Sequence, residues 1–358
     1  MKCLQPLETA PRAPAAAEVL RAESGTAAEE MSMYRRYQGA TEQLENAATE
    51  REKEIAWQTW EDVVFQYYED GYQIVTLIGF SMAGKTFFAN RLRYELSLDG
   101  WNVDPRAEDK RIERTAAKID WTQLTRGGKH PRRRVLADCD GEAYRESIDD
   151  LIKGDSVDEN LRRYVLMTAL ASAYILMVPA SATLEPTGDA DDLVGQFDVI
   201  VNAILTLQRR LRETGDARKV VREGLTGTFV RKALVHEFQC DRPIHVLFAQ
   251  ADKLSQVEQY ESDPAVYAMT HARTLYKRID NRFTNYRFDF VSAFAGYDDN
   301  SEKPIDYSLP HYGALAAFDW IDGMIEKPPL WKLTTAAAMR TRRLLDGGFR
   351  KARRMASQ

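Results

Sequence analysis

The fold is decided by the stretch Gln73-Ile74-Val75-Thr76-Leu77-Ile78-Gly79-Phe80-Ser81-Met82-Ala83-Gly84-Lys85-Thr86. Residues 74–78 form a short apolar run rich in β-branched side chains, which is typical of a strand buried on both faces. Residues 79–86 then fit G-x-x-x-x-G-K-[ST], in which two glycines let the backbone curl around a phosphate group. Apolar side chains recur after the loop at helical spacing, at Phe87, Phe88 and Leu92. The stretch therefore predicts a strand, a phosphate-binding loop and a helix that packs back on the strand.

The residue types in this loop suit a nucleoside triphosphate. Several backbone N–H groups point into such a loop, and the helix that begins near Lys85 adds the positive end of its dipole. We expect Lys85 to reach the β- and γ-phosphates and the Thr86 hydroxyl to ligate Mg²⁺. The residues expected to surround the phosphates are Gly79, Ser81, Met82, Ala83, Gly84, Lys85, Thr86 and Phe87.

Composition sets the broad class of protein. The chain has 358 residues, of which 44% are hydrophobic and 29% charged, as in ordinary globular proteins. A formal net charge of −5 argues against wholesale binding of nucleic acid. The odd number of cysteines does not suggest a disulfide framework, and none has metal-ligand spacing: Cys3, Cys139 and Cys240. Residues 1–17 lack an apolar signal core, so we expect a cytoplasmic protein.

One segment raises the question of a membrane span. Residues 164–183 carry no charged side chain and approach the length that crosses a bilayer. The segment is only moderately apolar, because it contains Thr168, Ser172, Pro179 and Ser181. We favour the end of a helix over residues 161–171, followed by a core strand over residues 174–178. The sequence therefore predicts no transmembrane span.

A second acidic motif follows a second apolar run. Residues 135–137 are apolar and lead into Asp138, and residues 138–141 fit D-x-x-G. In a protein with a phosphate-binding loop, an Asp at the end of a neighbouring strand can hold Mg²⁺, usually through water. The backbone N–H of Gly141 would then meet the γ-phosphate. The alternative interpretation is a simple acidic turn, because D-x-x-G alone is a weak signal.

The remaining pattern alternates strands with helices. Core strands are expected at residues 244–249 and 288–291, and helices at residues 193–214 and 312–321. This alternation predicts an α/β class, a three-layer fold with a mainly parallel sheet. We assign the main domain to residues 71–325, with an insertion within residues 183–240.

Extensions are expected at both ends of the chain. Residues 1–30 are rich in Ala, Pro and Glu, which predicts a disordered tail. Residues 31–70 have helical character, and residues 326–358 form a markedly basic segment that is also expected to be helical. The terminal helices and residues 101–134 are the surfaces on which we expect a protein partner.

Four motifs occur in one order: the phosphate-binding loop, D-x-x-G, a strand ending in residues 249–252, and a strand ending in Ser292-Ala293. This order resembles the translation-factor-like class of P-loop GTPases. The resemblance implies GTP or GDP as the ligand and Mg²⁺ as the cofactor. It also implies that Asp252 accepts hydrogen bonds from guanine and that Ser292-Ala293 brackets the guanine oxygen. Gln250 stands where that class has a lysine over the base, and Lys253 follows Asp252.

A narrower resemblance is to bacterial GTPases that are encoded in pairs or beside conflict-system genes. It is carried by the D-x-x-G-E motif of residues 138–142 and by the late helix of residues 312–321. Glu142 occupies the position where many GTPases have a glutamine that orients the attacking water. The threonine that completes the Mg²⁺ shell should lie within residues 101–134, where the candidates are Thr115, Thr122 and Thr125. Of these we prefer Thr122.

These observations predict a molecular switch that binds GTP and hydrolyses it slowly. A partner or self-association would then be needed to raise the rate of hydrolysis. Two alternatives stay open. The chain can be a nucleotide-binding scaffold with little hydrolysis, or a P-loop kinase that phosphorylates a small molecule, and phosphate release with GTP, ATP and candidate acceptors separates all three.

Overall fold

The computed structural model describes residues 33–79, 83–105, 119–128, 131–140, 159–180, 183, 188–224, 238–254, 257–260, 263–295 and 306–326. The chain divides into two units. One comprises Met1–Gly71 with Arg126–Arg132, and the other comprises Tyr72–Thr125 with Arg133–Gln358. The predicted tails at residues 1–30 and 326–358 lie outside the described residues, apart from Glu326.

The first unit contains two helical segments. Residues 33–46 are helical, and helix α2 spans Glu50–Glu69. Helix α2 begins with a capping box, in which the Thr49 side chain accepts from the backbone N–H of Glu52 and the Glu52 side chain accepts in return. Aromatic packing joins the two segments, since Tyr37 and Trp60 have ring centroids 6.2 Å apart.

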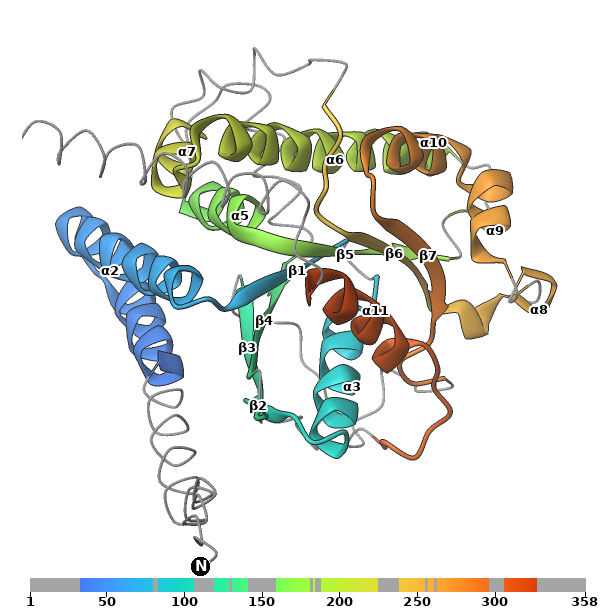
Figure 1. Ribbon diagram of the computed structural model, residues 1–358, viewed down its shortest axis with the longest axis horizontal. Helices are drawn as coiled ribbons and strands as arrows, with labels where there is room; N and C mark the ends of the chain where they lie inside the picture. The colour runs from blue at the N-terminus through green and yellow to red at the C-terminus, as the bar shows by residue number, and fades with distance from the viewer. Residues whose placement is uncertain are drawn as a thin grey trace, which may run out of the picture. The chain divides into compact units, whose positions relative to one another are not determined.

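The second unit is built on a seven-stranded sheet, in the order β2-β3-β4-β1-β5-β6-β7 (Figure 1). Neighbouring strands from β4 to β7 across the sheet pair in parallel, whereas β2 and β3 are antiparallel. The mainly parallel α/β sheet predicted from the sequence is therefore confirmed. The strands are β1 (Gln73–Gly79), β2 (Asn102–Asp104), β3 (Ile119–Arg126), β4 (Arg132–Cys139), β5 (Ala171–Pro179), β6 (Ile244–Ala249) and β7 (Tyr286–Val291).

Helices cover both faces of this sheet. Helices α5, α6, α7 and α10 lie on one face, and α3 and α11 lie on the other (Figure 1). In the part of this unit that the structure describes, the helices are α3 (Lys85–Leu98), α5 (Glu159–Leu170), α6 (Gly188–Thr214), α7 (Ala217–Gly224), α8 (Val257–Tyr260), α9 (Pro264–His271), α10 (Arg273–Arg282) and α11 (Ala314–Glu326), with a short 3₁₀ helix η3 at Ala251–Lys253.

The core lies along the central strands. Every residue of β1 after Gln73 is buried, and so is every residue of β6. An ion pair in the interior joins β4 to α11, because Arg134 Nε lies 2.6 Å from Asp322 Oδ1 and both side chains are less than a tenth exposed. These contacts fix the strand that carries Asp138 against the helical layer.

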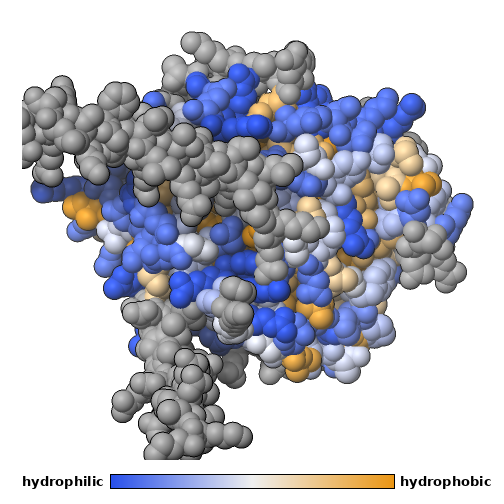
Figure 2. Space-filling view, in the orientation of Figure 1, coloured by the Kyte–Doolittle hydropathy of each residue, from blue (hydrophilic) through white to orange (hydrophobic). Residues whose placement is uncertain are grey.

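The uncharged segment at residues 164–183 proves to be a helix followed by a strand. Helix α5 ends at Leu170 and β5 begins at Ala171, so the predicted order of helix and strand is confirmed, but the strand begins three residues before its predicted start. In the described part of the chain, no helix combines the length and the apolar character needed to cross a membrane. On the face shown in Figure 2, the hydrophobic areas are small and separate.

Two strands were not predicted. The interval 101–134, for which the sequence predicted no strand, contains β2 and β3. Strand β3 hides its polar side chains rather than exposing them, since Thr122 and Gln123 are both buried. The usual alternation of polar and apolar residues is therefore lost in this strand.

Candidate functional site

A cavity of about 230 Å³ lies where the parallel strands β5, β6 and β7 end, beside the loop that follows β1. In open α/β sheets this carboxyl edge is where ligands bind. The lining residues come from four places in the chain. They are Ala83, Gly84, Phe87 and Phe88 after β1, Met177 in β5, Ala249, Gln250, Asp252 and Lys253 at the end of β6, and Val291, Ser292, Ala293 and Phe294 at the end of β7.

The two loop glycines meet different constraints. Gly79 pairs with Met177 of β5, and a Cβ at Gly79 would lie only 2.5 Å from the Met177 carbonyl oxygen. Gly84 has a φ of +75°, a left-handed conformation that glycine adopts without strain. Its carbonyl accepts the first helical hydrogen bond from Phe88 at 2.9 Å. Glycine at both positions thus lets the loop leave β1 and enter α3.

Lys85 begins α3 and turns back toward the end of β1. Its Nζ donates a hydrogen bond of 3.1 Å to the carbonyl oxygen of Gly79. Burial lowers the pKa of Lys85, and the charges of Asp138 and Asp140 oppose this effect. An anion in the loop would favour the charged lysine, so the arrangement suits a phosphate group. Ser81 and Met82, also predicted to line the phosphates, lie outside the described residues.

Thr86 and Asp138 lie together beside the loop. The Thr86 hydroxyl donates to Asp138 Oδ2 at 3.5 Å, although the two residues come from α3 and β4. The other carboxylate oxygen, Oδ1, is buried and has no hydrogen-bond partner among the described residues. Burial raises the pKa of Asp138 to about 7; Asp120 and Asp140 act in the same direction, against Lys85 and Arg93.

This pair fits a Mg²⁺ ion. Hydroxyl and carboxylate oxygens are the ligands that Mg²⁺ accepts in proteins, usually one or two of them with water and substrate phosphates completing the shell. A cation, or water bound to it, would satisfy the unpartnered Oδ1 and offset the unfavourable burial of the carboxylate. The described residues contain no cluster of three or more His, Cys, Asp or Glu that could hold a metal by themselves.

Thr122, our preferred candidate for the switch threonine, has a different role here. It lies inside β3, fully buried, and its hydroxyl accepts a hydrogen bond of 2.7 Å from Arg93 Nε. Arg93 also forms an ion pair with Asp120. The hydroxyl thus helps to hold α3 against β3. Thr115 and the pair Gly141 and Glu142 lie outside the described residues.

The opposite wall of the cavity is formed after β6 and β7. The Ser292 hydroxyl donates to Asp252 Oδ1 at 2.6 Å, which fixes the orientation of the carboxylate. Gln250 has a φ of +57° and is the one non-glycine with a positive φ among the described residues. Its Oε1 accepts from Lys253 Nζ at 3.2 Å. A strained backbone of this kind often marks a functional site.

The structure brings together most of the predicted site. The cavity joins Ala83, Gly84 and Phe87 to Gln250, Asp252 and Lys253 and to Ser292-Ala293, as the order of the motifs implied. Sequence reasoning missed five lining residues. Phe294 directly follows the last motif and could have been included, whereas Met177 depends on the β5 register and gave no signal; the other three are Phe88, Ala249 and Val291.

Comparisons with known proteins add structural likenesses of low score. No protein-family model matches the sequence, and no curated protein matches it. A Sar1-type small COPII coat GTPase from Encephalitozoon cuniculi, solved with GDP, has 12% identity and a TM-score of 0.31, covering 80% of this chain and 93% of that one.

Two further solved structures are similar at the same level. The signal recognition particle receptor SRb-GTP/SRX complex from Chaetomium thermophilum has 15% identity and a TM-score of 0.34, covering 63% of this chain and 93% of that one. A GTP-binding protein from Sulfolobus solfataricus, in complex with GDP, has 11% identity and a TM-score of 0.29, covering 74% and 61%. With TM-scores this low, the functional argument rests on the geometry of the site alone.

Proposed function

We propose that this chain is a Mg²⁺-dependent GTP-binding protein that hydrolyses GTP slowly and acts as a molecular switch. One observation carries the proposal. A single cavity joins the glycine loop at Gly84 to the Asp252–Ser292 pair, and the Thr86–Asp138 pair lies next to that loop. Phosphate-binding, cation-binding and base-binding groups thus meet at the edge of the sheet where nucleotides bind in α/β folds.

The phosphate end of the ligand would lie against the loop and the start of α3. The charged Lys85 would contact the β- and γ-phosphates, and the backbone N–H groups of residues 79–87 would cradle them. Thr86 and Asp138 would hold Mg²⁺, which when bound neutralises charge on the phosphate oxygens. Burial raises the pKa of Asp138 and so disfavours its charged form, and a bound cation would offset this cost.

The other end of the ligand would lie against Asp252 and Ser292. A carboxylate accepts from two neighbouring N–H donors, which guanine presents on one edge and adenine does not. Ser292 holds one carboxylate oxygen by a 2.6 Å hydrogen bond, so the acceptor is already oriented before the ligand arrives. Gln250 and Lys253 also line this side of the cavity. We therefore propose GTP and GDP, and not ATP, as the ligands.

Slow turnover is part of the proposal. Glu142 takes the place of the glutamine that orients water in many GTPases, and its negative charge would then lie beside a phosphate. Arg106, Arg111, Arg114 and Arg126 lie in the switch interval, but spacing fixes none of them as an arginine finger. We expect turnover at or below about 10⁻² s⁻¹ for the isolated chain. A partner at residues 101–134 or at the terminal helices, or a second copy, would raise it.

The test compares nucleotides and metal. Nucleotide extracted from the freshly purified protein is identified by chromatography, and phosphate release is then followed with GTP and with ATP, each with Mg²⁺ and with EDTA. We expect guanine nucleotide in the extract and slow release from GTP with Mg²⁺. Equal binding and turnover of ATP would contradict the guanine assignment. Binding without any release would favour the alternative of a nucleotide-binding scaffold.

A further inference from the structure

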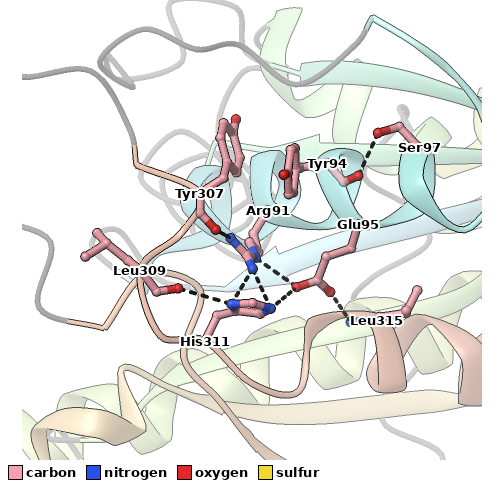
Figure 3. Close-up of polar contacts among 8 residues, drawn as sticks. All are labelled: Arg91, Tyr94, Glu95, Ser97, Tyr307, Leu309, His311 and Leu315. Carbon is pink, nitrogen blue, oxygen red and sulfur yellow. Dashed lines mark hydrogen bonds and ion pairs between the residues drawn. The ribbon is translucent and has the colours of Figure 1, made fainter.

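Arg91 occupies an unusual place in α3, six residues after Lys85. Its side chain is 2% exposed, although arginine is rarely buried unless it is paired. Its Nε donates to Glu95 Oε1 at 2.8 Å, and its Nη1 donates to the backbone carbonyl of Tyr307 at 2.7 Å (Figure 3). Arg91 thus ties the helix that follows the phosphate-binding loop to a segment more than two hundred residues away in sequence.

The same cluster includes the start of α11. Glu95 Oε1 lies 2.9 Å from His311 Nε2, and Glu95 Oε2 accepts from the backbone N–H of Leu315 at 3.0 Å. Arg91 Nη2 also contacts the His311 ring (Figure 3). Residues 306–312 and the first turn of α11 are therefore held to α3 by a network of charged and neutral hydrogen bonds, which is stronger than an isolated surface pair.

Arg91 also contacts the wall of the cavity. Its guanidinium carbon lies 5.5 Å from the centroid of the Phe294 ring, within the range of a cation–π interaction. Phe294 lines the cavity and packs edge-on against Phe87, with ring centroids 6.1 Å apart. On its other side, Phe294 packs edge-on against Tyr307 at 5.5 Å. Phe294 is thus enclosed by Phe87, Arg91 and Tyr307.

We propose that Arg91 is a positioning residue that holds Phe294 in the cavity wall, and that Phe294 contacts the base of the bound nucleotide. This inference rests on the proposed nucleotide site. Every base has an aromatic face that stacks on or packs against an aromatic side chain. The phosphates contact the glycine loop, so Arg91 affects the nucleoside half of the ligand and leaves the phosphate half alone.

The contacts explain why an arginine fills this position. Its planar guanidinium donates to Glu95 and to the Tyr307 carbonyl while its face covers Phe294, a combination that the single ammonium of lysine does not reproduce. The Tyr307 ring stacks on Tyr94 of α3 at 4.2 Å, which adds a second tie between the helix and this segment. Loss of the Tyr307 ring would loosen Phe294 and leave the buried Arg91–Glu95 pair intact.

The experiment measures affinity for GDP and for inorganic pyrophosphate, both with Mg²⁺, by calorimetry on the full chain. The variants are Phe294→Ala, Tyr307→Ala and Arg91→Lys, with Tyr307→Phe as the conservative substitution. Arg209→Lys is the matched control, because Arg209 forms an i,i+4 pair with Glu213 at the same 2.8 Å but on an exposed surface. Melting temperature confirms that each variant is folded.

We expect Phe294→Ala to weaken GDP about tenfold, within the range measured for aromatic contacts with bases, and to change pyrophosphate affinity less than about twofold. Tyr307→Ala and Arg91→Lys should show the same selective loss to a smaller degree, while Tyr307→Phe and Arg209→Lys match the wild type. Equal losses for both ligands, or unchanged GDP affinity in a folded Phe294→Ala protein, would overturn the inference alone. A wild type that binds neither ligand would overturn the proposed function, and the inference with it.

Discussion

The close contact between Gly79 and the backbone of Met177 predicts that Gly79→Ala lowers the stability of the protein. Gly79 is the last residue of β1 and pairs with Met177 of β5. A Cβ at Gly79 would meet the Met177 carbonyl oxygen at 2.5 Å, about 0.9 Å short of an ordinary van der Waals contact. The neighbouring atom belongs to backbone and cannot rotate away. The substitution must therefore separate the two strands where they line the site.

The magnitude follows from this overlap. Overpacking a rigid interior typically costs about 1–3 kcal/mol, which corresponds to a fall in melting temperature of about 3–10 °C for a domain of this size. Because the Gly79 carbonyl accepts the hydrogen bond from Lys85, nucleotide affinity should fall as well. Thermal unfolding and GDP titration of the purified variant measure both effects.

Gly323→Ala is the matched control for this substitution. Gly323 lies in helix α11, where an added Cβ meets nothing within 4 Å. Alanine should stabilise the helix there by about 0.5–1 kcal/mol and leave GDP affinity unchanged. A Gly79→Ala protein that melts at the wild-type temperature or above would refute the reasoning, because β1 and β5 would then accommodate an added Cβ without strain.

Four further predictions follow from the same contacts. Lys85→Ala should abolish GTP binding in a filter or fluorescence assay, because it removes the main positive charge at the phosphates; undiminished binding would contradict the loop assignment. Asp252→Asn should weaken GTP binding at least tenfold and reduce the preference for GTP over ATP in competition titrations. An equal loss of affinity for both nucleotides would contradict a contact with the base. Asp138→Asn should raise the melting temperature in EDTA, because burial opposes the carboxylate charge, and should abolish the extra stabilisation by Mg²⁺ with GDP. Arg134→Met should destabilise by about 3–5 kcal/mol, and a second change, Asp322→Leu, should restore most of that loss in chemical unfolding, since the pair is buried.

The sequence predicts strand β1 and the start of helix α3 well because both are local. A strand that is apolar over residues 74–78 apart from Thr76, one glycine loop and one helix start are contiguous, and each has a pattern set by backbone geometry. A helix followed by a strand within residues 161–178 was also predicted, although the strand begins at Ala171 and not at residue 174. There, Pro179 and the polar residues argued against a continuous membrane helix.

The sequence fails where burial of polar groups depends on distant partners. Strand β3 carries Thr122 and Asp120 among its apolar residues, and both are satisfied by Arg93 from another part of the chain. An arginine 27 or 29 positions away leaves no periodic signal in the strand itself. The same contact uses the hydroxyl of Thr122, the preferred candidate for the switch threonine, to pack α3 against β3.

Base recognition is the least local part of the site. Asp252 and Ser292 are 40 positions apart, and the network behind Phe294 joins Arg91 to His311 across 220 positions. The short motifs at Asp252 and Ser292 give no sign of Arg91, because its contacts form only when α3 and residues 306–312 pack together. A phosphate is held by the backbone of one turn, whereas a base needs a shaped wall made of side chains from several elements. Substitutions far outside the recognised motifs, at Arg91 and Tyr307, should therefore weaken the contact with the nucleoside half of the ligand more than the contact with its phosphates.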